Sequence, residues 1–372
     1  MPAIRFRSAL DRISSYRPTE VANGAAPPRP LSANETPHAP LPGVVEAIAA
    51  AAASAHRYPD AWCRELSRSI ARAHGIDTDR VLVGAGSVSL LQALFQAFGE
   101  PGDEVVYAWR SFELYEELAE LAGLRSIRVP LADAVHDLPA MADRVTDRTR
   151  LVVVCNPNNP TGTVVGHDAL RAFLARIPPT CLVALDEAYI EYTRAPDAAR
   201  GRELCEEYPN LVVLRTFSKA YGLAGLRVGY LLGAADVVAQ LDKTCLPYAV
   251  NTVAQRAAEA ALGLQAELAH RVEATVAERT RVRDALLARG WRVPDAQGNF
   301  LWLGLGAASA EFGRWCMSRR IAVRTFAGEG VRVTIGLDQD NDAFLKAVAD
   351  WGDAPESAAP ERGGAAAGAA KR

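Results

Sequence analysis

The chain of 372 residues lacks several features that mark large classes of proteins. Its 41 lysine and arginine residues face 44 aspartate and glutamate residues, so the formal charge of −3 gives no basic excess for binding nucleic acid. It contains no run of about 18 uncharged apolar residues, and its start, MPAIRFRSAL, has no apolar core of a secretory signal. These absences predict a cytoplasmic protein with neither a membrane nor a nucleic-acid partner.

Cysteine chemistry and nucleotide-binding fingerprints are also missing. The six cysteines form no C-x-x-C pair and none lies beside a histidine at metal-ligand spacing, which predicts no metal site and reduced, mostly buried thiols. No G-x-x-x-x-G-K-[ST] motif occurs, and Ser89 stands where a dinucleotide fingerprint starting at Gly84 would have its third glycine.

Composition and length predict an ordinary globular chain with two domains and two irregular ends. Of its residues, 49% are hydrophobic and 23% charged. The proline-rich residues 1–40 predict an extended N-terminal arm, and a helix is expected from Leu41, with Pro42 near its start. Residues 353–372, almost all Ala, Gly, Pro, Glu and Arg, predict a disordered tail.

Short apolar runs alternate with helical stretches in the middle of the chain. Because strands of this kind are buried on both faces, they predict an α/β fold with a mainly parallel sheet flanked by helices, in a large domain over residues 41–250. The expected strands lie at residues 81–83, 105–107, 151–154, 182–185, 211–214 and 228–231.

A smaller α+β domain is predicted over residues 251–352. It begins with a long charged helix over residues 253–289, which could be interrupted at Gly263. The remaining expected elements are a strand at 300–303, a helix at 310–319, strands at 321–324 and 331–335, and a helix from residue 341.

Unusual residues follow two of the predicted strands, at the sheet edge where ligands of such folds bind. Gly84-Ala85-Gly86-Ser87 precedes a helix and offers backbone N–H groups and a helix N-terminus to an anion, although a plain strand-to-helix turn would read the same. A stiff Asn-Pro loop over residues 156–162 presents Asn159 as an orienting amide, or is simply a turn.

Charged residues follow two more strands. Asp186 needs a cationic or hydrogen-bonding partner at the end of a buried strand, and Tyr189 is close enough in sequence to reach the same ligand. Lys219 lies between hydroxyl residues and a glycine-rich loop, with Arg227 eight residues later, a setting that packing alone does not explain.

Together these strand ends supply what a pyridoxal phosphate site requires. Lys219 would bond to the aldehyde, Asp186 would keep the ring nitrogen protonated, and Asn159 and Tyr189 would face the phenolic oxygen. The residues assigned to the phosphate are Ala85, Gly86, Ser87, Thr216, Ser218 and Arg227.

The order of these motifs resembles fold-type I aminotransferases of class II. The stretches Asn159-Pro160-Thr161-Gly162, Asp186-x-x-Tyr189 and Thr216-Phe217-Ser218-Lys219 carry the likeness. The arm and residues 57–60 and 332–336 resemble the histidinol-phosphate aminotransferase subfamily. Residues 86–90 and 109–115 are similar to its actinobacterial aromatic (phenylalanine) aminotransferases, and Gly84-Ala85-Gly86-Ser87 replaces the Gly-Ala-Asp-Glu stretch usual in the histidinol-phosphate enzymes.

This resemblance implies roles for further residues. Phe112 would stack on the cofactor ring, and Tyr58 would reach the cofactor phosphate of a neighbouring subunit in a homodimer. Tyr115 and Tyr248 could add to an apolar substrate pocket. The implied substrate-binding residues are Arg332, Arg324, Tyr16, Asn34 and Asn299, with arm packing as the alternative role of Tyr16 and Asn34 and an exposed strand position as that of Arg324.

The implied reaction is transfer of an amino group from phenylalanine, tyrosine or tryptophan to 2-oxoglutarate, giving an aromatic oxo acid and glutamate. Histidinol phosphate is the alternative donor. A lyase similar to threonine-phosphate decarboxylases and a non-catalytic binding protein are more distant alternatives, and the intact Lys219, Asp186 and Arg227 argue against the second.

Overall fold

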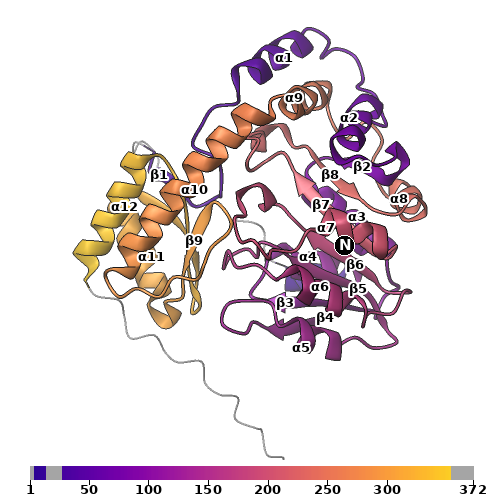
Figure 1. Ribbon diagram of the computed structural model, residues 1–372. Coiled ribbons are helices and arrows are strands. Elements are labelled where there is room, and N and C mark those ends of the chain that lie inside the picture. Colours follow the sequence, from indigo (N-terminus) through magenta and orange to yellow (C-terminus); the bar gives the residue numbers. More distant parts are fainter. Residues whose placement is uncertain (1–3, 14–26, 353–372) are drawn as a thin grey trace, which may run out of the picture.

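The computed structural model describes residues 4–13 and 27–352 of the chain. Two β-sheets lie side by side and a long helix, α10 (Gln265–Leu287), runs from the larger unit to the smaller one (Figure 1). The predicted tail, residues 353–372, and Tyr16 of the arm lie outside the described residues.

The larger sheet has seven strands in the order β2-β8-β7-β6-β5-β3-β4. Only β8 runs antiparallel to its neighbours, so the prediction of a mainly parallel sheet is confirmed. One edge strand, β4, was not predicted. The strands are β2 (Val81–Gly84), β3 (Glu104–Trp109), β4 (Arg125–Pro130), β5 (Thr149–Cys155), β6 (Leu182–Asp186), β7 (Leu211–Thr216) and β8 (Gly229–Leu232).

Helices bury both faces of this sheet, as the continuous apolar runs require. Along β5, Leu151 and Val153 face one apolar core, whereas Val152 and Val154 face the other. The first core is closed by α3 (Ser87–Ala97), α4 (Leu114–Ala122) and α8 (Ala235–Asp242). The second is closed by α1 (Pro42–Ala52), α2 (Arg64–His74), α5 (Leu138–Asp143), α6 (His167–Leu174), α7 (Gly201–Glu207) and α9 (Thr252–Leu262).

The smaller sheet has the order β1-β10-β11-β9 and its own apolar core. Its strands are β1 (Arg29–Leu31), β9 (Phe300–Leu303), β10 (Ile321–Phe326) and β11 (Gly330–Thr334), and the helices packed on it are α10, α11 (Ser309–Ser318) and α12 (Asp338–Trp351). The arm contributes β1, which pairs in parallel with β10. The final helix begins at Asp338, three residues before the predicted start.

The predicted long helix is two helices, α9 and α10, which are separated at Gly263 and Leu264. Ala254, Ala257 and Ala258 of α9 pack into the core of the larger sheet. The domain boundary at residue 250 stays a prediction, and this packing places α9 with the larger unit.

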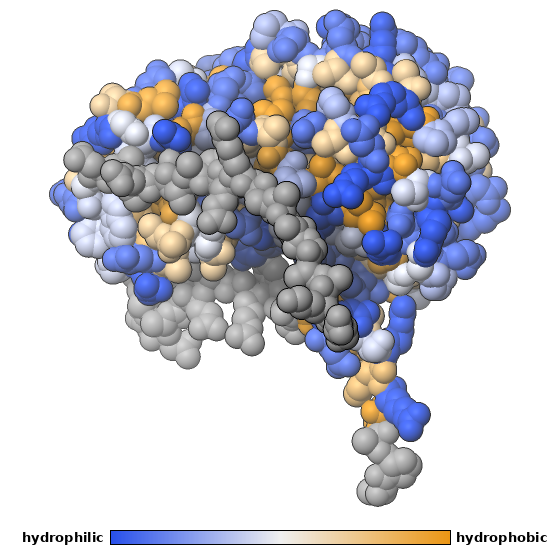
Figure 2. Space-filling model, turned by 90° about the horizontal axis from the view of Figure 1, so that it is seen from below, coloured by the Kyte–Doolittle hydropathy of each residue, from blue (hydrophilic) through white to orange (hydrophobic). Residues whose placement is uncertain are grey.

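The surface and the cysteines of the described residues show no feature of a membrane-spanning helix or of a disulfide. Figure 2 shows a mainly hydrophilic face with several hydrophobic patches. Within residues 4–13 and 27–352 no helix combines the length and apolarity needed to cross a membrane. All six cysteines are free, and all but Cys245 are buried, as predicted.

Substituting Gly229 by alanine should destabilise the larger unit. A Cβ there would lie 2.6 Å from the backbone nitrogen of Ser87 and 2.9 Å from the carbonyl oxygen of Arg215, so backbone must shift. We expect the Gly229→Ala free energy of unfolding to fall by about 1–3 kcal/mol in urea titrations. Gly225→Ala, whose Cβ would meet nothing within 4 Å, is the control and should change it by less than about 0.5 kcal/mol. Equal effects of the two variants would contradict this prediction.

Candidate active site

A cavity of about 200 Å³ opens where β5, β6 and β7 end. It brings together nine of the residues predicted from the sequence, because the carboxyl ends of parallel strands meet at one edge of the sheet. These are Ser87, Phe112, Asn159, Asp186, Tyr189, Thr216, Ser218, Lys219 and Arg227. The prediction that strand ends converge on one site therefore matches the geometry.

Asp186 lines this cavity and is almost fully buried. Its Oδ2 accepts a hydrogen bond from the hydroxyl of Tyr115 at 2.7 Å. Its Oδ1 has no hydrogen-bond partner among the described residues. Burial raises the pKa of Asp186 to about 6, although the Tyr115 hydroxyl, then the backbone of Ala188 and least the Lys219 charge oppose that rise. One oxygen of the carboxylate is thus held and the other is left for a donor inside the cavity.

Lys219 follows β7 and donates from Nζ to the carbonyl oxygen of Ala33 at 3.1 Å. Its ammonium group also lies 5.8 Å from the centre of the Tyr189 ring. Burial, and after it the positive charge of Arg332, lower the pKa of Lys219 to about 7. A large part of this amine is therefore neutral near pH 7, the form that attacks a carbonyl carbon.

A cradle for an anion forms between α3 and the loop after Lys219. Gly86 precedes α3 with a φ of 81°, and a Cβ on it would lie 2.4 Å from Nη2 of Arg227. Arg227 also donates to the Ser218 hydroxyl at 3.3 Å. The N-terminus of α3, a guanidinium group and a hydroxyl thus meet at one end of the cavity, a set that suits a phosphate. Ala85 lies in the same turn but outside the cavity lining.

A second cavity of about 140 Å³ adjoins the first, and Phe112, Asn159 and Lys219 line both. Its wall contains both arginines predicted to bind substrate, Arg324 and Arg332. Arg332 is buried and donates to Oδ1 of Asn159 at 2.5 Å and to the Ser32 carbonyl oxygen at 2.6 Å.

Asn34 and Asn299 lie outside the lining of both cavities and instead hold the arm in place. Asn34 donates to the Tyr189 hydroxyl at 3.0 Å, and its Oδ1 and backbone N–H bond to the hydroxyl of Thr334. Asn299 donates to the Asn34 carbonyl oxygen at 3.1 Å. These bonds fix the neighbouring Ala33 at Lys219, so the two amides act through the arm.

Two predicted aromatic residues lie outside the lining of both cavities in this chain. Tyr58 is 84% exposed, and its ring lies 4.9 Å from that of Tyr248. Tyr248, like Tyr58, lines neither cavity of this chain, and its place in a substrate pocket stays a prediction. Tyr16 lies outside the described residues.

Sequence reasoning missed several groups that shape the site. Tyr115 was expected in the substrate pocket, but it is fully buried behind Phe112 and bonds to Asp186. Tyr115 lies in the first turn of α4 and Phe112 lies two residues before that helix begins, and their rings pack edge to face with centres 5.6 Å apart. Ala33 and Glu35 also line the cavity, and they belong to the arm, whose likeness to the subfamily was the signal that could have indicated them.

Comparisons with known proteins agree with this geometry. Residues 29–348 match the family model of class I and II aminotransferases. The chain belongs to this family. This aminotransferase is 55% identical to an aromatic amino acid aminotransferase of Thermobifida fusca over 91% of this chain and 95% of that protein. It is 51% identical to an aromatic amino acid aminotransferase of Streptomyces coelicolor, over 92% and 96% of the two chains.

Among solved structures, this aminotransferase is similar to histidinol-phosphate aminotransferase from Sinorhizobium meliloti, crystallised with pyridoxal 5′-phosphate. The TM-score is 0.85 and the identity 27%, over 94% of this chain and 98% of the other. The resemblance to aminotransferases drawn from the motifs is confirmed, and so is the fold class.

Replacing Tyr115 by phenylalanine should raise the pKa of Asp186 above about 6, because the lost hydroxyl favours the ionised carboxylate. Carbon-13 NMR of protein labelled at the aspartate carboxyl carbons would follow the titration, with Asp186→Asn to assign the signal. Tyr107→Phe is the control, since its ring lies 5.9 Å from that of Tyr115 in the same cluster. An unchanged Asp186 titration in Tyr115→Phe would refute the assignment.

Proposed function

We propose that this aminotransferase binds pyridoxal 5′-phosphate in the cavity at Lys219. The residues present fit each part of that molecule. Oδ1 of Asp186, a buried acceptor without a partner among the described residues, suits the ring N–H, and the amine of Lys219 suits the aldehyde. The cradle at Gly86, Ser218 and Arg227 suits the phosphate. Phe112, in the lining of the same cavity, would face the ring.

When bound, this cofactor supplies the electron sink that makes the α-proton of an amino acid acidic. Lys219, with its pKa lowered to about 7, would accept that proton at Nζ and return it. Asp186 would hold a negative charge opposite the ring nitrogen, and Arg332 would bind the substrate α-carboxylate through its planar guanidinium group. The observation that carries the proposal is that Lys219 and Asp186 line one cavity with Arg332 in the wall of the adjoining one.

The amino donor proposed is an aromatic amino acid, phenylalanine first, with 2-oxoglutarate as acceptor. Relatives about half identical over nearly the whole chain are aromatic amino acid aminotransferases. The cavity beside Lys219 also has three aromatic walls, from Phe112, Tyr189 and Phe326, which suit an apolar ring.

Steady-state assays with the purified protein, pyridoxal phosphate and 2-oxoglutarate should show a higher kcat/KM for phenylalanine than for histidinol phosphate. Product phenylpyruvate and glutamate are measured together, so that transfer is distinguished from carbon dioxide release. Lys219→Ala should lose amino transfer by at least about a thousandfold, since it removes the group that moves the proton. A higher kcat/KM for histidinol phosphate would contradict the proposed donor. It would favour the activity for which the Sinorhizobium meliloti enzyme is named.

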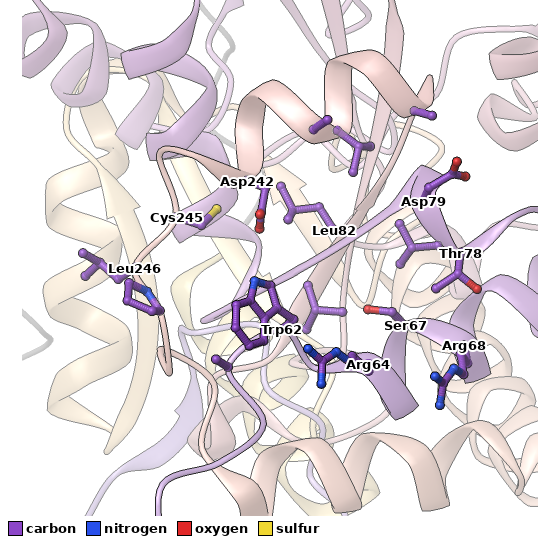
Figure 3. Close-up of a pocket in the computed structure, with 17 residues that line it drawn as sticks. Trp62, Arg64, Ser67, Arg68, Thr78, Asp79, Leu82, Asp242, Cys245 and Leu246 are labelled. Carbon is purple, nitrogen blue, oxygen red and sulfur yellow. The ribbon is translucent and has the colours of Figure 1, made fainter.

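We also propose that the enzyme is a homodimer in which Tyr58 reaches the cofactor phosphate of the other subunit. Large apolar side chains are exposed together in two segments, Tyr58 with Trp62 and Leu246 with Tyr248. Trp62 and Leu246 line a cleft of about 570 Å³ between α2 and the end of α8, as Figure 3 shows. Exposed apolar groups gathered in this way indicate a surface that another copy covers.

Light scattering coupled to gel filtration tests the assembly. The wild-type protein should elute at twice the monomer mass, and Leu246→Glu should shift it toward the monomer, because a charge would be buried in the interface. Leu287→Glu, which changes an exposed leucine of α10, is the matched control. A monomeric wild-type protein would rule out the dimer while leaving the cofactor proposal to its own assay.

A further inference from the structure

The wall of the second cavity contains two arginines with different partners. Arg324 of β10 and Arg332 of β11 are directly opposite each other in the antiparallel pair. Like charges at such positions repel. Arg332 donates to two neutral oxygen atoms, those of Asn159 and Ser32, whereas Arg324 forms an ion pair with Glu113.

Glu113 comes from the other unit, one residue after Phe112 and directly before α4. Both partners of the ion pair line the cavity, and both are only partly exposed, at 31% for Glu113 and 24% for Arg324. An anion entering beside Arg324 would meet the Glu113 carboxylate at the same wall. The two opposite charges largely cancel, so a ligand meets little net charge at Arg324.

Aromatic rings also line this cavity. The guanidinium carbon of Arg324 lies 5.8 Å from the centre of the Phe326 ring, and Phe112 lines the same cavity. A flat, charge-compensated guanidinium near an aromatic ring favours an uncharged aromatic ring over a phosphate or a second carboxylate.

We propose that Glu113 is a specificity-determining residue: by pairing with Arg324 it makes the distal part of the substrate cavity select aromatic rather than anionic side chains. This inference rests on the proposed function, since it assigns the distal group of the amino acid to this wall. A substrate carboxylate would bind Arg332, and the group at its other end would meet the Glu113 and Arg324 pair.

A matched control lies in the same interface. Arg110 forms an ion pair with Glu329, which also connects the loop before α4 to the smaller unit. Neither residue lines the cavity. Glu329→Gln therefore weakens the contact between the units without changing the charge that a ligand meets, whereas Glu113→Gln changes both.

The test uses two unreactive ligands on the cofactor-loaded enzyme, 3-phenylpropanoate and 3-phosphonopropanoate. Both carry the carboxylate for Arg332 and differ only in the distal group, and neither has an amino group to transfer. Dissociation constants from calorimetry should favour 3-phenylpropanoate in the wild type. Glu113→Gln should tighten 3-phosphonopropanoate by about tenfold, since removing a negative charge a few ångströms away is worth about 1.4 kcal/mol, and leave 3-phenylpropanoate within about twofold.

The remaining variants decide the cause. Adding Arg324→Gln to Glu113→Gln should return 3-phosphonopropanoate binding to the wild-type value, and Glu329→Gln should leave both ligands unchanged. Unaltered 3-phosphonopropanoate binding in Glu113→Gln, or the same tightening in Glu329→Gln, would overturn the inference. Unaltered binding of 3-phenylpropanoate shows that a variant is folded. Failure of the proposed function is seen separately, as absence of amino transfer from phenylalanine by the wild type.

Discussion

Burying an ionisable carboxylate at the end of a central strand is costly, and the candidate active site depends on how that cost is met at Asp186. The Tyr115 hydroxyl satisfies one oxygen, and the nearby positive charge of Lys219 favours the ionised form. The same low-polarity surroundings act in the opposite direction on Lys219, whose pKa falls to about 7. One environment therefore raises the pKa of an acid and lowers the pKa of a base, so that the two values move toward each other.

The seven-stranded sheet holds these charged residues in place. Apolar cores on both faces hold β5, β6 and β7 in register, and their ends carry Asn159, Asp186 and Lys219 to one edge. The smaller unit then adds Arg332 across the opening, bonded to Asn159. Stability thus resides in the sheet interior, and the chemistry lies at its border, where polar groups need not satisfy the packing of the core.

The sequence allowed the parts of the molecule governed by local pattern to be predicted. Strands buried on both faces, such as β5, are visible as apolar runs. The edge strand β4 exposes Arg125 and Arg128 and has no such run, so it was missed. Likewise β1 has only three residues, including Pro30, and is a strand only because β10 pairs with it.

The residues of the candidate site also fall into those that the sequence predicts and those that it does not. Residues at strand ends were predicted because topology alone brings them together. The contacts of Tyr115 with Asp186, Asn34 with Tyr189 and Arg324 with Glu113 join residues 71, 155 and 211 positions apart, and side-chain placement decides each of them. No pattern in one sequence encodes such distances, since many other pairings have the same spacing and chemistry.

The arm strand β1 has a mechanical consequence for Lys219. Its hydrogen bonds to β10 make it part of the smaller sheet, and the residues that follow it include Ala33, whose carbonyl oxygen accepts the bond from Nζ. The acceptor for the lysine is thus carried by one unit and the lysine by the other. A movement that separates the two units would break this bond, so the position of the Lys219 amine depends on how closely the units pack.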